Sequence, residues 1–116
     1  MLGKLSVDRG ELAERLREVV AGPVHLCAGG PCQTGRVAVI TGAAGSEVAA
    51  VAAAGADSLV TGEGPHWSYP LAEELGVNLF YAGHYATETF GVKALAHDLA
   101  GRFGLTWSFL DHPTGL

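Results

Sequence analysis

The sequence predicts an α/β fold in which a mostly parallel sheet has helices on both faces, giving three layers. Short runs rich in β-branched residues alternate along the chain with helical segments, and three of these helical segments stop at glycines 55, 76 and 104. Strands that alternate with helices are joined by right-handed crossovers, which make neighbouring strands parallel. Residues 36–41 are typical of a short strand that is buried on both faces.

The expected elements follow from helix caps, apolar spacing and turn residues. Asp8 and Glu11 form a capping box for a first helix, which ends near residues 21–23. Residues 28–35 have the composition of a turn. Strands are expected at residues 24–27, 36–41, 57–61, 77–81 and 105–110, and further helices at residues 46–54, at residues 65–75 and from the His84 to Glu88 region up to Gly104.

Length and cysteine content indicate one α/β domain, residues 1–116. A chain of 116 residues can form a hydrophobic core without help from disulfide bonds or structural metal ions. Cys27 and Cys32 are separated by four residues rather than by the two of a zinc knuckle or redox motif, and the sequence has no second pair. We therefore interpret both cysteines as structural or incidental.

The charge distribution argues against a nucleic-acid partner. Seven Lys and Arg residues against twelve Asp and Glu residues give a net charge of −5, and the basic residues form no cluster. The longest apolar runs, such as residues 48–56, are about half the ~20 residues that a membrane span requires. The N-terminus also lacks the apolar core of a signal peptide. We therefore expect a cytoplasmic protein without a membrane partner.

Three loops are expected to meet at one edge of the sheet. These loops, at residues 42–46, 62–66 and 83–84, each follow a predicted strand. In open α/β sheets, ligands bind beyond the carboxyl ends of the strands. Parallel strands would therefore bring together four candidate site residues that are scattered in sequence, namely Glu63, His66, His84 and Glu88.

His84 and Glu88 form the strongest candidate pair. They are four residues apart, so both lie on one face of a helix that includes them. The apolar positions that follow at helical spacing predict that this face is buried; they are Val92, Leu95, Ala96, Leu99 and Phe103. A carboxylate there must be paired, bound to a ligand or placed at a helix N-terminus. Imidazole with carboxylate suits zinc, iron or manganese, but a metal site needs further donors, for which Glu63 and His66 are candidates.

A glycine-rich turn containing Gly42, Gly45 and Ser46 is a candidate phosphate site. Backbone amides in such a turn can bind phosphate where a helix begins. The turn lacks the complete dinucleotide-binding fingerprint and also the lysine of a Walker loop. The glycines serve equally well to form the turn and to let the helix pack closely on the strand. Both interpretations remain open from the sequence.

Several motifs resemble one family in the same order and spacing. Residues 81–88 (Tyr-Ala-Gly-His-Tyr-Ala-Thr-Glu), residues 91–95 and residues 109–115 (Phe-Leu-Asp-His-Pro-Thr-Gly) closely resemble the C-terminal end of the GTP cyclohydrolase I type 2 homologue family, also called the Nif-three-like proteins. Residues 55–57 and 61–63 resemble that family's preceding strand and loop. The similarity covers essentially the whole chain.

The resemblance implies a metal-binding protein. Members of the family are cytoplasmic α/β proteins that assemble as hexameric toroids and hold two divalent metal ions, and His84 and Glu88 match the metal-ligand motif near their C-terminus. Their other ligands, an adjacent pair of histidines and an aspartate, lie in an N-terminal half without a counterpart here. The resemblance therefore implies a C-terminal half, a homo-oligomer and, as a further partner, the missing N-terminal half.

Two functions follow as expectations. In the first, a metal ion held by His84 and Glu88 activates water for hydrolysis, Glu63 or His66 carries a proton, and a nucleotide or other phosphorylated small molecule binds near the turn at residues 42–46. In the second, the chain is a non-catalytic oligomeric binding or assembly module whose metal site is incomplete.

Overall fold

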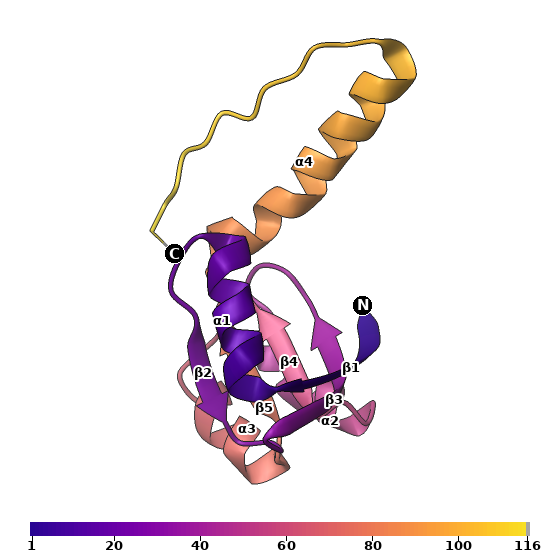
Figure 1. Ribbon diagram of the computed structural model, residues 1–116. Coiled ribbons are helices and arrows are strands. Elements are labelled where there is room, and N and C mark those ends of the chain that lie inside the picture. Colours follow the sequence, from indigo (N-terminus) through magenta and orange to yellow (C-terminus); the bar gives the residue numbers. More distant parts are fainter. Residues whose placement is uncertain (116) are drawn as a thin grey trace.

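Strands and helices alternate through most of the chain (Figure 1). The computed structural model describes residues 1–115. The strands are β1 (Leu2–Asp8), β2 (His25–Ala28), β3 (Gln33–Val39), β4 (Ser58–Thr61) and β5 (Asn78–Tyr81). The helices are α1 (Arg9–Val20), α2 (Val48–Ala53), α3 (Ser68–Leu75) and α4 (His84–Phe103), and a short 3₁₀ turn, η1 (Gly45–Glu47), precedes α2.

The five described strands form one sheet in the order β1-β3-β4-β5-β2. The central strands β3, β4 and β5 are parallel, with Val39 opposite Val60 and Val60 opposite Phe80. The edge strands β1 and β2 are antiparallel to their neighbours β3 and β5. The predicted α/β fold is thus confirmed, with a sheet that is parallel in its centre and mixed at its edges.

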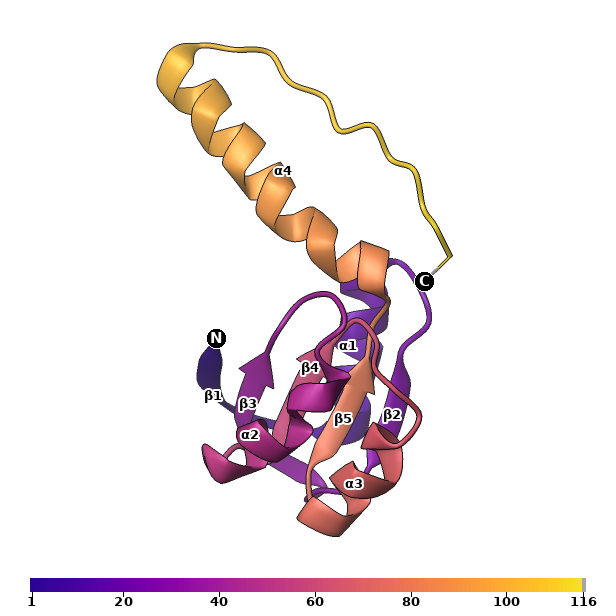
Figure 2. The ribbon, with the colours of Figure 1, turned by 180° about the vertical axis from the view of Figure 1, so that it is seen from behind.

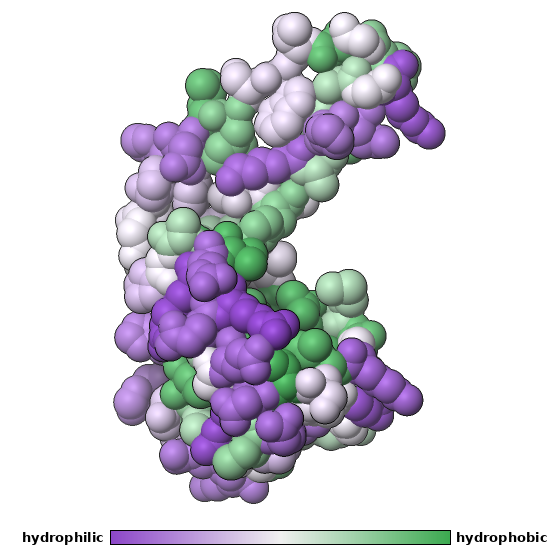
Figure 3. All heavy atoms as spheres, in the orientation of Figure 1, coloured by the Kyte–Doolittle hydropathy of each residue, from purple (hydrophilic) through white to green (hydrophobic). Residues whose placement is uncertain are grey.

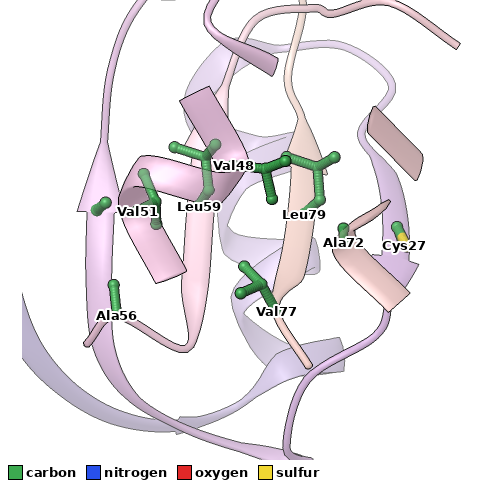
Figure 4. Packing of buried hydrophobic residues seen from close by; sticks show 9 residues of the cluster. Cys27, Val48, Val51, Ala56, Leu59, Ala72, Val77 and Leu79 are labelled. Atoms are coloured by element: carbon green, nitrogen blue, oxygen red, sulfur yellow. The ribbon is translucent and has the colours of Figure 1, made fainter. Parts of the chain in front are cut away.

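Helices cover both faces of the sheet, as predicted. Helix α1 lies on one face and helices α2 and α3 lie on the other (Figures 1 and 2). Successive residues of the central strands point to opposite faces, so Leu59 and Leu79 pack toward α2 and α3 whereas Val60 and Phe80 pack in the cluster that contains Leu12 of α1. Figure 4 shows the first of these clusters, in which Val48 and Val51 of α2 face Leu59 and Leu79.

The sequence predicted the structure near the N-terminus only in part. The side chain of Asp8 accepts hydrogen bonds from the amides of Gly10 and Glu11, which confirms the predicted cap of α1. Strand β1, however, was not predicted. Only Val7 of its seven residues is buried, so the strand has no alternating pattern and depends on its pairing with β3.

The prediction for the C-terminal region is wrong in two respects. Residues 105–110 form no strand, and the apolar stripe of α4 is not buried, since Val92, Leu95 and Phe103 are 55%, 58% and 66% exposed. Helix α4 leaves the edge of the sheet and extends away from it, followed by an extended tail (Figures 1 and 2). Helical spacing identifies an apolar face but does not say whether this chain itself covers that face.

Two further predictions concern cysteines and membranes. Cys27 is buried and Cys32 is exposed, and both are free thiols, in line with a structural or incidental role. Within residues 1–115, no helix combines the length and the apolarity that crossing a bilayer requires.

Candidate functional site

The three predicted loops converge at the carboxyl ends of β3, β4 and β5. The amides of Gly62 and Glu63 both donate to the carbonyl oxygen of Gly42, at 2.9 and 3.0 Å. The amide of Gly83 donates in turn to the carbonyl oxygen of Gly62, at 3.0 Å. Hydrogen bonds between the backbones therefore fix the loops relative to one another, and the convergence expected from parallel strands is confirmed.

Two buried threonines, which the sequence analysis did not single out, hold these loops. Thr61 Oγ1 donates to the carbonyl of Gly42 and accepts from the amide of Ala44. Thr87 Oγ1 accepts from the amide of Gly42 and donates to the carbonyl of His84, within the first turn of α4. Each hydroxyl thus joins the turn after β3 to a neighbouring element. The sequence signal that could have pointed to them was a threonine beside a candidate loop. Threonines are too common in such positions for this signal to be diagnostic.

His84 lies between two carboxylates at this edge of the sheet. Its Nδ1 is 2.8 Å from Glu63 Oε1, and its Nε2 is 3.4 Å from Glu88 Oε1. An ionised carboxylate only accepts hydrogen bonds, so Nδ1 donates to Glu63. In the neutral imidazole, the lone pair then lies on Nε2, which faces Glu88. The structure therefore brings Glu63, His84 and Glu88 together.

Gly42 provides the space beside these groups. Its φ of +73° lies in the left-handed region, which favours glycine. A Cβ atom at this position would lie 2.7 Å from Glu88 Oε1 and 3.4 Å from His84 Nε2. The positive φ favours glycine here, and a side chain at this position would displace the Glu88 carboxylate from its place beside His84. The sequence analysis had interpreted Gly42 as part of a phosphate site or simply of a turn.

The charge environment raises the pKa of His84 above its ordinary value of 6.5. The hydrogen bond to Glu63 is the largest cause, partial desolvation acts in the opposite direction, and the negative charge of Glu88 adds to the increase. The protonated imidazole is thus stabilised by the same two carboxylates that would accompany a bound cation. Any cation that bound Nε2 would have to displace a proton from it.

His66 and the glycine-rich turn do not join this cluster. The side chain of His66 is exposed, and within residues 1–115 it makes no hydrogen bond or ion pair with the other candidates. The amides of Gly42, Ala44 and Gly45 already donate to Thr87, Thr61 and the Glu63 carbonyl. A phosphate group would have to use other donors of this turn, so phosphate binding at Gly42, Gly45 and Ser46 stays a prediction.

The residues present are few for a metal centre. No group of three or more His, Cys, Asp or Glu side chains within the described part of the chain is arranged to hold a metal ion. Glu63 accepts a hydrogen bond from Nδ1 of His84, the ring nitrogen that does not face Glu88, and so orients the ring. Of the candidate residues described by the structure, His84 and Glu88 are therefore the two whose free donor atoms face each other.

A cavity of about 620 Å³ adjoins Glu63. It lies between the turn after α1, the loop at residues 62–64, the first turns of α4 and the C-terminal tail. Its charged lining includes Lys93, whose Nζ lies 4.2 Å from the centre of the Phe109 ring and 3.2 Å from Thr89 Oγ1. The volume is within the range of pockets that bind small molecules.

Comparison with known proteins identifies the family. The family Duf34/NIF3 (NGG1p interacting factor 3) matches residues 1–114. The chain belongs to the Duf34/NIF3 family. This finding confirms the family that the C-terminal motifs predicted, and curated relatives that match this chain carry the name GTP cyclohydrolase 1 type 2 homolog.

Individual Duf34/NIF3 relatives match nearly all of this chain but less than half of their own length. A GTP cyclohydrolase 1 type 2 homolog from Deinococcus radiodurans is 41% identical over 106 residues, which are 91% of this chain and 40% of the relative. The crystal structure of TTHA1606 from Thermus thermophilus is 41% identical, with a TM-score of 0.85 over 100% of this chain and 45% of its own. Protein ybgI, described as of unknown function, is 32% identical, with a TM-score of 0.91 over 97% of this chain and 47% of its own.

Proposed function

We propose that this Duf34/NIF3 chain binds a divalent metal ion through His84 and Glu88 and acts in metal-dependent hydrolysis of a nucleotide or another phosphorylated small molecule. The observation that carries the proposal is the position of His84, which donates from Nδ1 to Glu63 and turns Nε2 toward Glu88. Imidazole nitrogen and carboxylate oxygen together suit zinc, iron or manganese.

The geometry of the pair is compatible with one shared ion. Ligand atoms that each lie about 2.1 Å from the same ion are separated by about 3–3.5 Å. Nε2 of His84 and Oε1 of Glu88 are 3.4 Å apart, and Gly42 keeps the adjacent space free of a side chain. Glu63 resembles the outer carboxylate that commonly orients a metal-binding histidine.

The chain's own residues have separate roles in this proposal. A divalent ion supplies Lewis acidity and activates water for hydrolysis. Glu63 holds the proton on Nδ1, which keeps the Nε2 lone pair available, and its carboxylate borders the cavity where a substrate would lie. Lys93 lines that cavity together with the acidic residues Glu63 and Asp111, and its ammonium group is the one that would pair with a phosphate of the ligand.

Metal titration tests this proposal. We expect the wild-type chain to bind Zn²⁺ or Mn²⁺ at one site in calorimetry, and His84→Ala to weaken that binding at least about a hundredfold. His66→Ala is the control, because His66 is exposed and, within residues 1–115, makes no hydrogen bond or ion pair with the cluster. Binding that is unchanged in His84→Ala would exclude this site.

The metal affinity should also depend on pH. The raised pKa keeps His84 protonated at a higher pH than a free histidine, so a metal ion must displace this proton. Below the raised pKa, we expect the affinity for Zn²⁺ to fall about tenfold for each pH unit, and above it to level off. Titrations between about pH 5.5 and about 8 measure this, and an affinity independent of pH over that range would contradict a role for His84.

A second function, a non-catalytic oligomeric binding or assembly module with an incomplete metal site, is favoured by a different observation. Within the described residues, no three ligand side chains are arranged around one ion. An assay for hydrolysis of nucleoside phosphates with added Mn²⁺ separates the two functions. Turnover that is lost in His84→Ala supports the hydrolase, whereas metal binding without turnover, in a chain that sizing chromatography shows to be oligomeric, supports the module.

A further inference from the structure

A second cavity, of about 200 Å³, lies on the side of the sheet that α1 covers. Its walls come from α1, the end of β3, β4 and the first turns of α4, and its lining residues include Leu16, Ile40, Val60 and Phe90. Apolar atoms alone form its surface. Figure 3 shows hydrophobic atoms in a hollow beside α1 and below α4. We call this space the apolar cavity, and the cavity of about 620 Å³ described above the Glu63 cavity.

The apolar cavity suits an aromatic hydrocarbon group. A protein cavity of about 150 Å³ that is lined by Leu, Ile and Phe side chains stays dry and binds benzene. The apolar cavity has a similar lining and a volume of about 200 Å³. The hydroxyl of Thr87, which also lines it, is already hydrogen-bonded to the amide of Gly42 and the carbonyl of His84. A nucleobase placed there would lose the hydrogen bonds of its N–H and C=O groups, so the cavity favours a hydrocarbon.

The apolar cavity and the Glu63 cavity adjoin. Both are lined by Val19, Val20, Ala82 and Phe90. Phe90 and Lys93 are three residues apart on α4, so their side chains are neighbours on the helix surface, with Cβ atoms about 5–6 Å apart. A ligand whose hydrocarbon and anionic groups are joined by a short link can therefore reach the apolar cavity and Lys93 at the same time.

Lys93 supplies a positive charge where the cavities adjoin. Among the described residues that line the two cavities, it is the only lysine or arginine. Its ammonium group has three N–H donors, one of which is donated to Thr89 Oγ1 at 3.2 Å, and the centre of the Phe109 ring lies 4.2 Å away. Lys93 therefore keeps N–H donors for a phosphate group.

Two carboxylates also line the Glu63 cavity, and both already accept hydrogen bonds. Glu63 accepts from His84 Nδ1 at 2.8 Å, and Asp111 accepts from the Tyr85 hydroxyl at 3.0 Å. Their negative charges disfavour an anion beside them. An anionic group that enters this cavity is therefore most stable at Lys93.

We infer that the two cavities together bind a phosphate ester whose organic part is an aromatic hydrocarbon group, with the phosphate at Lys93 and the hydrocarbon in the apolar cavity. The inference rests on the proposed function for the phosphate, and it narrows the ligand to a class other than nucleotides. Phe90 of α4 and Val19 of α1, which line both cavities, are then residues that determine specificity.

A comparison of four compounds tests this inference without a metal ion. Binding of 1-naphthyl phosphate, inorganic phosphate, 1-naphthol and adenosine 5′-phosphate to the 116-residue chain is measured by NMR titration in EDTA. We expect 1-naphthyl phosphate to bind at least about tenfold more tightly than each of the others. Its naphthyl protons should show nuclear Overhauser effects to the methyl groups of Leu16 and Val60, which line the apolar cavity.

Phe90→Asn and Phe103→Asn form a matched pair of variants. Both phenylalanines lie on α4 and are 43% and 66% exposed, but Phe90 lines both cavities whereas Phe103 lies at the far end of the helix. Phe90→Asn should weaken the binding of 1-naphthyl phosphate at least about tenfold and leave inorganic phosphate unchanged. Phe103→Asn should change neither.

Two further variants separate the two ends of the ligand. Val19→Asn, at a 62% exposed position of α1, should act like Phe90→Asn and replaces it if circular dichroism shows that Phe90→Asn does not fold. Lys93→Gln should weaken the binding of 1-naphthyl phosphate and of inorganic phosphate at least about tenfold and leave 1-naphthol unchanged.

Equal affinity of 1-naphthyl phosphate and any one of the other three compounds would overturn the inference. So would a lack of binding in a chain that sizing chromatography shows to be a dimer that Phe90→Asn dissociates, since a second copy would then cover the apolar cavity. The proposed function fails separately, by metal binding that does not respond to His84→Ala, because the titrations in EDTA do not involve a metal ion at His84 and Glu88.

Discussion

Replacing Phe80 by alanine is expected to lower the free energy of unfolding by about 3–5 kcal/mol. Phe80 is fully buried in β5 and packs in the cluster that joins the sheet to α1, so the substitution removes a large apolar volume from a site bounded by several elements. Domains of this size have a total stability of about 5–15 kcal/mol. The variant should therefore lose roughly half of its stability in urea denaturation, with a midpoint temperature lower by about 10–20 °C.

Phe103→Ala is the matched control for this substitution. Phe103 is also a phenylalanine but lies near the end of α4, where it is 66% exposed. Its removal should change the free energy of unfolding by no more than about 0.5 kcal/mol. Equal destabilisation by the two variants would mean that Phe103 is packed in the free chain and would contradict its exposed position on α4.

Gly62→Ala is expected to damage the fold and the site together. A Cβ atom on Gly62 would lie 2.6 Å from His84 Cα, 2.7 Å from the Gly42 oxygen and 2.8 Å from the Gly83 oxygen. These are backbone atoms of the other two loops, so they cannot move aside as a flexible side chain would. We expect a loss of about 1–3 kcal/mol in stability and displacement of His84 relative to Glu63 and Glu88, and hence a large loss of metal affinity.

Gly91→Ala shows whether this effect is specific. Gly91 lies within α4, and a Cβ atom there would meet nothing within 4 Å. Since alanine favours a helix over glycine by about 1 kcal/mol, this variant should be as stable as the wild type or slightly more stable. Wild-type stability and metal affinity in Gly62→Ala would contradict the close approach of the three loops.

The elements that could be predicted are those whose packing or termini require a recognisable pattern of residues in the sequence. The central strands read as short apolar runs, and glycines mark the ends of α3 and α4, where Gly76 and Gly104 adopt positive φ values. Strand β1 was missed because its stability comes from hydrogen bonds to β3 and not from an apolar face. The strand predicted at residues 105–110 has the right pattern but no partner strand among the described residues, and a strand needs a partner.

The candidate site was predictable to the extent that it depends on topology. Parallel strands brought Glu63, His84 and Glu88 to one edge, as the loop positions indicated. His66 was proposed on the same grounds, but the turn before α3 leaves it exposed and away from the cluster. The space kept by Gly42 and the bonds made by Thr61 and Thr87 depend on tertiary distances, for which a single sequence contains no signal.

Nitrogen NMR of the His84 ring tests the central claim most directly, namely that Glu63 fixes the ring so that Nε2 and Glu88 face one cation. Ring ¹⁵N spectra of the labelled chain are recorded with and without Zn²⁺, and His84 is assigned by comparison with His84→Ala. We expect Zn²⁺ to shift Nε2 while Nδ1 keeps its proton, because that proton is donated to Glu63. Loss of the Nδ1 proton, or no response of His84 to saturating Zn²⁺, would contradict the account.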